Sequence, residues 1–198
     1  MAPEMAPEIQ VSRETFEPYA LLLQREGVER GLIGPREGER IWERHIYNCL
    51  PLATLIPAGA RVVDIGSGAG LPGIVLALAR PDISVLLLEP LERRCAFLRE
   101  AIDHLALQNV TLERKKALDY QGKFDVVTAR AVAPMDRLLA WSWHLLAPGG
   151  RILAMKGDRA EEELAQSPLS RYQGASGEIC EAILPTGGCK VISIAKAG

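Results

Sequence analysis

Residues 62–70, Val62-Val-Asp-Ile-Gly-Ser-Gly-Ala-Gly70, decide the fold of this 198-residue chain. An apolar run ends in an acid and opens into glycines at 66, 68 and 70, and a second apolar run occupies 74–79. Glycine adopts positive φ without strain and leaves room for a molecule beside the backbone. The stretch therefore predicts a strand, a ligand-binding turn and a helix. The alternative interpretation is a tight turn that binds no ligand.

The spacing of the glycines indicates which ligand the turn suits. The dinucleotide fingerprint G-x-G-x-x-G requires its third glycine where this chain has Leu71. No cradle for a pyrophosphate is therefore predicted, which disfavours a dinucleotide oxidoreductase. A G-x-G-x-G turn suits a nucleoside ligand without phosphates.

Two acids strengthen this interpretation. Glu89 ends the apolar run 84–88, 23 residues after Gly66, where a parallel neighbouring strand would place it beside the turn to accept both ribose hydroxyls. Its alternative role is that of an acid at a helix start. Asp64 lies in an apolar strand, and because an unpaired buried carboxylate is costly, we expect it to orient loop amides or a ligand ammonium. Together these features favour an adenosine-containing ligand.

Hydrophobic periodicity predicts an α/β fold. Two N-terminal helices are expected at 13–26 and 36–50, strands at 61–65, 84–89, 110–114, 124–129 and 151–156, and helices at 71–80, 91–106 and 135–146. This alternation is typical of a mostly parallel, twisted sheet with helices on both faces. The last two strands, 178–184 and 189–196, would form an antiparallel hairpin at one edge.

Length and tail composition suggest how the chain is organised. We expect a single domain over 11–198, with N-terminal helices in 11–58 and the α/β core in 59–198. The proline- and acid-rich start, residues 1–10, is expected to be a disordered tail. We also expect a monomer.

Charge, cysteines and hydropathy exclude several classes of function. The net charge is −2 and the pI about 6.0, so any nucleic acid must be held by local patches. Four cysteines form no C-x-x-C pair and three histidines are scattered, so no metal site is predicted. No signal peptide and no membrane-spanning run is recognisable, which predicts a cytoplasmic protein.

Longer motifs resemble one known family. Asp64-Ile-Gly-Ser-Gly-Ala-Gly-Leu-Pro-Gly-Ile74 resembles the loop of class I S-adenosylmethionine-dependent methyltransferases. Together with Arg44-His-Ile46, Phe124-Asp-Val-Val-Thr-Ala-Arg-Ala131 and Met155-Lys-Gly157 it resembles the glucose-inhibited division protein B family, from about residue 36 to the C-terminus. The resemblance implies a Rossmann-like methyltransferase fold. It also implies S-adenosylmethionine as cofactor, and as partner 16S ribosomal RNA or the small ribosomal subunit, methylated at guanine N7.

The motifs and the resemblance together define a candidate cofactor site. Its predicted residues are Asp64, Gly66, Ser67, Gly68, Gly70, Leu71, Glu89, Ala117, Leu118 and Arg130. The resemblance implies that Gly66 and Leu71 line the methionine and adenosine part, with Ala117 and Leu118 near the adenine. Family members commonly carry an acid where this chain has Leu118, so a main-chain contact to adenine is expected there.

The predicted chemistry needs little covalent help. Guanine N7 has a lone pair and no proton, so no general base is expected. Ala129-Arg-Ala-Val-Ala133 stands where methylases of exocyclic amines usually carry an Asn/Asp-Pro-Pro-aromatic run. Arg130 and Lys156 are the predicted catalytic residues, acting by orientation. The alternative for Arg130 is an ion pair with a neighbouring acid.

Contacts with RNA phosphates are predicted for Arg44, His45, Arg151 and Lys156. The alternative for the three cationic side chains is an ordinary solvated charge, and for His45 a half-buried helix residue. Trp141 and Trp143 lie at helical spacing, so core packing is favoured over base stacking.

Two rival functions would use the same kind of ligand but differ in what is methylated, or in whether anything is methylated. A methyltransferase of a small metabolite would suit the mild acidity of the chain. A nucleoside-binding regulatory protein without catalysis is the other. Identifying which acceptor becomes labelled by a methyl donor discriminates between them.

Overall fold

The computed structural model describes residues 8–198, which fold around one seven-stranded sheet. Its strands are β1 Arg61–Ile65, β2 Ser84–Leu88, β3 Val110–Glu113, β4 Phe124–Arg130, β5 Leu146–Lys156, β6 Ala175–Leu184 and β7 Gly187–Lys196. The order is β3-β2-β1-β4-β5-β7-β6; the first five strands are parallel, and β7 and β6 are added antiparallel. The predicted fold class, including the edge hairpin, is confirmed.

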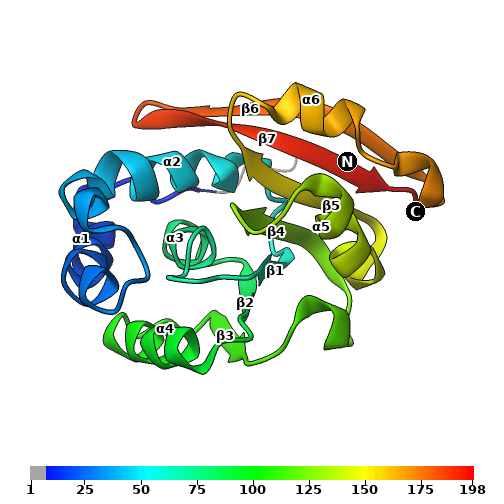
Figure 1. The fold of residues 1–198 in the computed structure, drawn as a ribbon. Coiled ribbons are helices and arrows are strands. Elements are labelled where there is room, and N and C mark those ends of the chain that lie inside the picture. Colours follow the sequence, from blue (N-terminus) through cyan, green and yellow to red (C-terminus); the bar gives the residue numbers. More distant parts are fainter. Residues whose placement is uncertain (1–7) are drawn as a thin grey trace.

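Helices cover both faces of the sheet (Figure 1). They are α1 Arg13–Leu22, α2 Tyr47–Cys49, α3 Gly73–Ala79, α4 Glu92–His104, α5 Met135–Ser142 and α6 Ala160–Ala165. The alternating side chains of β1 explain the two layers: Val62 packs into the core shared by α1, α3 and α4, whereas Val63 packs into the core shared by α5 and α6. Each face of the sheet is thereby removed from water.

The N-terminal region forms more irregular helices than predicted. The helix α1 continues into a π-helical turn, Leu23–Gly27. The single helix expected over 36–50 is instead a series of short pieces: 3₁₀ Pro35–Arg40, π-helical Trp42–Ile46, α2, and 3₁₀ Leu50–Leu55. Fully buried side chains, including Tyr19 and Ile46, pack this region into the same core as α3.

The predicted tail over 1–10 is only partly within the described chain. Residues 1–7 lie outside the described residues. Ile9 packs against the core, and the Gln10 amide donates a hydrogen bond of 2.9 Å to the Ala79 carbonyl. The prediction of disorder is therefore wrong for these two residues, because they have partners far along the chain.

Two elements differ from expectation for local reasons. The strand β5 begins at Leu146 rather than 151, since Leu146 already pairs with Phe124 before a register shift. The helix α6 was not predicted, because only Ala160 of its six residues is buried and it leaves no apolar periodicity to read.

Candidate functional site

The glycine turn follows β1 at the carboxyl end of the parallel strands. Gly66, Gly68 and Gly70 have φ angles of 65°, 61° and 93°, in the region that only glycine enters without strain. A Cβ on Gly70 would lie 2.5 Å from Ile74 Cδ1 and 3.0 Å from the Tyr19 hydroxyl, so any side chain there would displace these two side chains. The amides of Gly66 and Ser67 donate to the Leu88 carbonyl at 2.8 and 3.2 Å, which fixes the turn to β2.

Asp64 anchors the turn from beneath. Its carboxylate is fully buried, and Oδ2 accepts a hydrogen bond of 3.0 Å from the Gly73 amide at the start of α3. Burial is the main cause that raises the pKa of Asp64 to about 7. Oδ1 has no hydrogen-bond partner within residues 8–198. Asp64 thus binds a loop amide, one of its two expected roles.

Glu89 lies directly after β2 and points back at the glycine turn. Its Oε2 accepts from the Gly68 amide at 3.0 Å and its Oε1 from the Leu91 amide at 2.9 Å, with Arg94 Nη1 3.5 Å from Oε2. The Leu91 contact matches the alternative role at a helix start. Because Glu89 also lines a cavity, a contact with a ribose stays a prediction.

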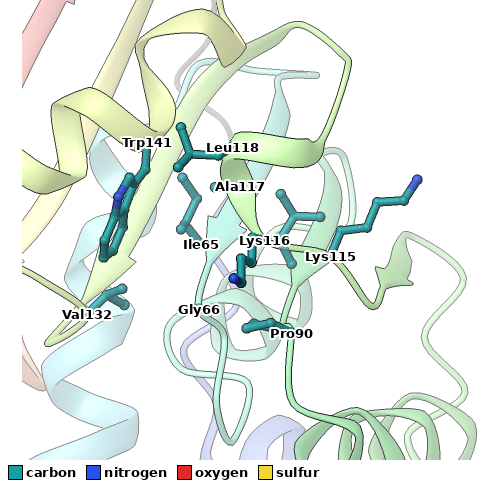
Figure 2. A pocket seen from close by; sticks show the side chains of 10 residues that line it. Ile65, Gly66, Pro90, Lys115, Lys116, Ala117, Leu118, Val132 and Trp141 are labelled. Carbon is teal, nitrogen blue, oxygen red and sulfur yellow. The ribbon is translucent and has the colours of Figure 1, made fainter.

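A largely apolar cavity of about 370 Å³ opens beside the turn (Figure 2). It is lined by Ile65, Gly66, Leu88, Pro90, Lys115, Lys116, Ala117, Leu118, Val132 and Trp141. Figure 2 shows Trp141 and Val132 on one side and Lys116 and Pro90 on the other. The predicted pair Ala117 and Leu118 therefore does lie at the site, with the Leu118 side chain 52% exposed.

A second cavity of about 760 Å³ adjoins the first. Gly66, Pro90 and Val132 line both, so the two form one elongated recess across the turn. The second cavity is also lined by Leu32, Ile33, Glu37, Arg44, His45, Ser67, Gly68, Ala69, Leu71, Glu89, Leu91, Arg94, Arg130 and Ala131. It therefore carries the acids and arginines that the first cavity, whose only charged lining residues are two lysines, lacks.

Arg130 ends β4 at the wall of the second cavity. Nη2 donates 3.1 Å to the Arg44 carbonyl and lies 2.9 Å from His45 Nδ1, and Nη1 donates 3.2 Å to Cys49 Sγ. It has no ion pair with an acid of the described chain, so the alternative interpretation is wrong. The next residue, Ala131, has a φ of 52°, a backbone strain that often accompanies functional sites.

His45 is a buried member of the same site. Its side chain is 4% exposed, and Nε2 lies 3.3 Å from Glu37 Oε2. Burial, with Arg130 second, lowers the pKa of His45 to about 4, so the ring is neutral at pH 7. This placement does not favour a contact between His45 and an RNA phosphate. It favours the alternative, a helix residue that is buried in the fold.

Comparison with known proteins decides the family. Residues 12–174 match the family model GidB, described as rRNA small subunit methyltransferase G. The chain belongs to the GidB family. Two relatives named Ribosomal RNA small subunit methyltransferase G share 56% identity over 151 residues (Thermobifida fusca) and 53% over 182 residues (Streptomyces avermitilis). The matches cover 75% and 86% of this chain, and 64% and 76% of those relatives.

Solved structures with low sequence identity to this chain share its fold. A ribosomal protein L11 methylase from Lactobacillus delbrueckii subsp. bulgaricus has a TM-score of 0.60 at 17% identity, covering 77% of this chain and 78% of its own. A putative O-methyltransferase from Klebsiella pneumoniae has a TM-score of 0.60 at 16% identity, covering 95% and 92%. The fold is thus that of class I methyltransferases.

One motif residue of the GidB resemblance lies behind the site. Lys156 Nζ donates 2.9 Å to the Ala133 carbonyl and pairs with Glu163 Oε2 at 2.7 Å, with its side chain 11% exposed. It lines neither cavity and instead supports the loop after Arg130. The ammonium is already bonded, so a direct catalytic or phosphate contact stays a prediction that the placement does not favour.

Arg151 is not brought to the site. It pairs with Val126 in the register of β4 and β5, whereas Met155 pairs with Arg130. Four residues of strand, about 13 Å, therefore separate it from the level of Arg130. The structure therefore does not bring Arg151 to the recess, and an RNA contact by this residue stays a prediction that its place toward the opposite end of the strand does not favour. Arg44 does line the recess, with Nη1 3.6 Å from Glu37 Oε1.

Several residues of the site were not predicted as site residues, and three of them make contacts that shape it. The Tyr19 hydroxyl binds the glycine turn, Glu37 faces His45, and Trp141 walls the apolar cavity. Trp141 also packs against the core as predicted, as does Trp143. A signal was present for Trp141 alone, an aromatic residue in the last turn of the helix that follows the ligand-side loop.

No helix within residues 8–198 is long and apolar enough to cross a membrane. No group of three or more His, Cys, Asp or Glu side chains there lies close enough together to hold a metal ion.

Proposed function

We propose that this chain is an S-adenosylmethionine-dependent methyltransferase that methylates guanine N7 in 16S ribosomal RNA. The observation that carries the proposal is the elongated recess across the glycine turn, apolar at one end and charged at the other, in a chain of the GidB family. The names of its relatives support the small ribosomal subunit as the acceptor.

The residues of the recess fit the cofactor. A Cβ on Gly68 would meet only the Gly66 carbonyl, at 3.7 Å, so this part of the turn presents open backbone to a ligand. The apolar cavity, with Trp141 and Ala117, suits an adenine ring. Glu89 suits the ribose hydroxyls, and the second cavity suits the charged amino-acid end. When bound, S-adenosylmethionine supplies an electrophilic methyl group on a positively charged sulfur.

The remaining task of the chain is to orient the acceptor and exclude water. The lone pair of N7 needs no base, and the acids and the histidine of the recess are committed to other contacts: Glu89 to backbone amides, Glu37 toward His45, and His45 toward Arg130. Arg130, whose planar guanidinium can form two parallel hydrogen bonds, orients the reactants. Apolar Leu71 and Val132 beside it exclude competing water.

An acceptor experiment tests the proposal. The protein is incubated with methyl-labelled S-adenosylmethionine and, separately, undermodified small subunits, naked 16S RNA, free nucleosides and a pool of small metabolites. Label in RNA of the first or second sample is expected. Label confined to nucleosides or metabolites would favour the rival methyltransferase. Cofactor binding without label in any sample would favour the nucleoside-binding regulator.

Two further proposals, on location and on oligomeric state, accompany this one. Action on ribosomal RNA goes with a cytoplasmic location, and we propose that the chain works there as a monomer. Sedimentation of the purified protein, alone and with small subunits, measures the second directly.

A further inference from the structure

All hydrogen bonds of the Arg130 guanidinium in the described chain go to one short helical segment. Its partners are the Arg44 carbonyl, His45 Nδ1 and Cys49 Sγ, within the π-helical turn Trp42–Ile46 and the adjoining α2. A carbonyl is always an acceptor. The imidazole is different, because each of its nitrogens accepts or donates depending on where the ring proton lies. The hydrogen bonding of Arg130 therefore depends on which nitrogen of the His45 ring carries the proton.

The geometry identifies the tautomer that this hydrogen bonding requires. A guanidinium only donates, so Nδ1 must be the acceptor and a neutral ring carries its proton on Nε2. The negative charge nearest to that proton is Glu37, whose Oε2 lies 3.3 Å from Nε2, although no hydrogen bond joins the two atoms in the described chain. With the ring 4% exposed, water is a poor substitute for the carboxylate. The charged groups that face His45 are Glu37, Arg44 and Arg130.

We infer that Glu37 is a positioning residue for the proposed methyl transfer, acting through the tautomer of His45 to hold the guanidinium of Arg130 beside the glycine turn. The inference rests on the proposed function, since it gives Glu37 a part in that reaction. Without the carboxylate, the proton at Nε2 loses the negative charge nearest to it. A proton on Nδ1 instead would place a second donor against the Arg130 donor. Arg130 would then lose its shortest contact.

Glu37 is itself held in place. Its amide donates 2.9 Å to the Gly34 carbonyl at the start of the 3₁₀ turn, and its second oxygen lies 3.6 Å from Arg44 Nη1. The carboxylate thus joins a surface arginine, exposed at the rim of the recess, to the buried ring. RNA that engages Arg44 would act on the same carboxylate that orders Arg130.

A double-mutant cycle tests the inference. Single-turnover methylation of small subunits is measured at saturating donor for Glu37→Ala, Arg130→Ala and the double variant. We expect Glu37→Ala to be about tenfold slower than wild type, and the double variant to be no slower than Arg130→Ala, as for residues in one network. Glu37→Gln, whose amide oxygen can accept from Nε2, should recover most of the rate. Glu39→Ala, exposed on the same turn, is the matched control for the loss of one negative charge.

The nitrogen-15 spectrum of the His45 ring gives a readout independent of catalysis. The wild type should show the Nε2-protonated tautomer, and Glu37→Ala a shift toward Nδ1. Additive effects of the two alanine variants, or an Nδ1-protonated ring in the wild type, would overturn the inference. If Glu37→Ala does not fold, the wild-type spectrum together with the rate of Glu37→Gln decides. A wild type that methylates no RNA would instead refute the proposed function, with the tautomer result unaffected.

Discussion

The hydroxyl of Tyr19 donates a 2.6 Å hydrogen bond to the carbonyl of Ala69, 50 residues away in the glycine turn. Tyr19 is fully buried in α1, and desolvation is the main cause that raises the pKa of its phenol well above the ordinary value. The phenol therefore stays a donor across the physiological range. Through this bond the N-terminal helices, which precede the α/β core, help to shape the candidate cofactor site.

Tyr19→Phe should weaken cofactor binding. The substitution keeps the ring in the core but leaves the Ala69 carbonyl without its donor, a loss of about 1 to 2 kcal/mol. Calorimetry should show S-adenosylmethionine affinity about five- to thirtyfold lower. Tyr47→Phe, which removes a hydroxyl from the same helical region, should bind as the wild type does. Equal affinities for the two variants would show that the hydrogen bond from Tyr19 in α1 does not contribute to cofactor binding.

Asp64 predicts a pH dependence of stability. Its pKa is about 7 in the folded chain, against an ordinary value of 3.8. Between these values the folded state holds the proton and the unfolded state does not, so stability falls as pH rises, by up to about 1.4 kcal/mol per pH unit. Asp64→Asn should remove this part of the slope of the unfolding free energy. A slope unchanged by the substitution would mean that Asp64 is ionised throughout.

Arg130→Ala should separate activity from folding. The side chain is partly exposed at the recess, so its loss costs little stability, whereas the account makes it the main orienting group. Methylation should fall by about a hundredfold, as for groups that fix reacting geometry. Arg130→Lys should not restore it, because one ammonium cannot replace a planar fork. Parallel losses of melting temperature and activity would contradict the role.

Trp141→Ala should lower affinity for the adenosine part of the cofactor. An aromatic face is worth about 0.5–1.5 kcal/mol beyond its buried area, so affinity should drop by at least roughly two- to tenfold. Trp143→Ala is the control, since that ring lies 5.2 Å from Tyr172 and lines neither cavity. Binding of adenosine alone isolates the effect. If only Trp143→Ala weakened it, the apolar cavity would not hold the base.

The salt dependence of RNA binding distinguishes two arginines. If Arg44 contacts a phosphate, Arg44→Ala should reduce the slope of log affinity against log salt by about 0.7 to 0.9. Arg151→Ala should leave it unchanged, since that residue lies toward the other end of its strand. Equivalent slopes for both variants would place the RNA elsewhere.

Hydrophobic runs and turn residues in the sequence predict the strands and the edge hairpin well. The strand 61–65 was predicted to the residue, because an apolar run bounded by Arg61 and a glycine turn has clear ends. The position of Glu89 followed from the geometry of adjacent parallel strands. The edge hairpin followed from two strands around Pro185-Thr-Gly-Gly188, although both strands begin three or two residues earlier than expected.

Contacts between distant residues could not be read in the same way. Nothing near Tyr19 in the sequence indicates the Ala69 carbonyl, and nothing near Glu37 indicates a ring that orders Arg130. Lys156 looked like a free cation because its partner Glu163 lies on a helix with no apolar signature. The sequence therefore predicts RNA contacts for two cationic residues that the fold uses or places differently. Lys156 is already paired with Glu163, and Arg151 lies away from the recess.

The central claim is that the methyl group is transferred to guanine N7. The most direct measurement is nucleoside analysis of 16S RNA from undermodified small subunits after incubation with the protein and methyl-labelled S-adenosylmethionine. The account predicts label in 7-methylguanosine, present with wild type and reduced about a hundredfold with Arg130→Ala. Label in a different nucleoside, or no label in RNA despite measured cofactor binding, would contradict it.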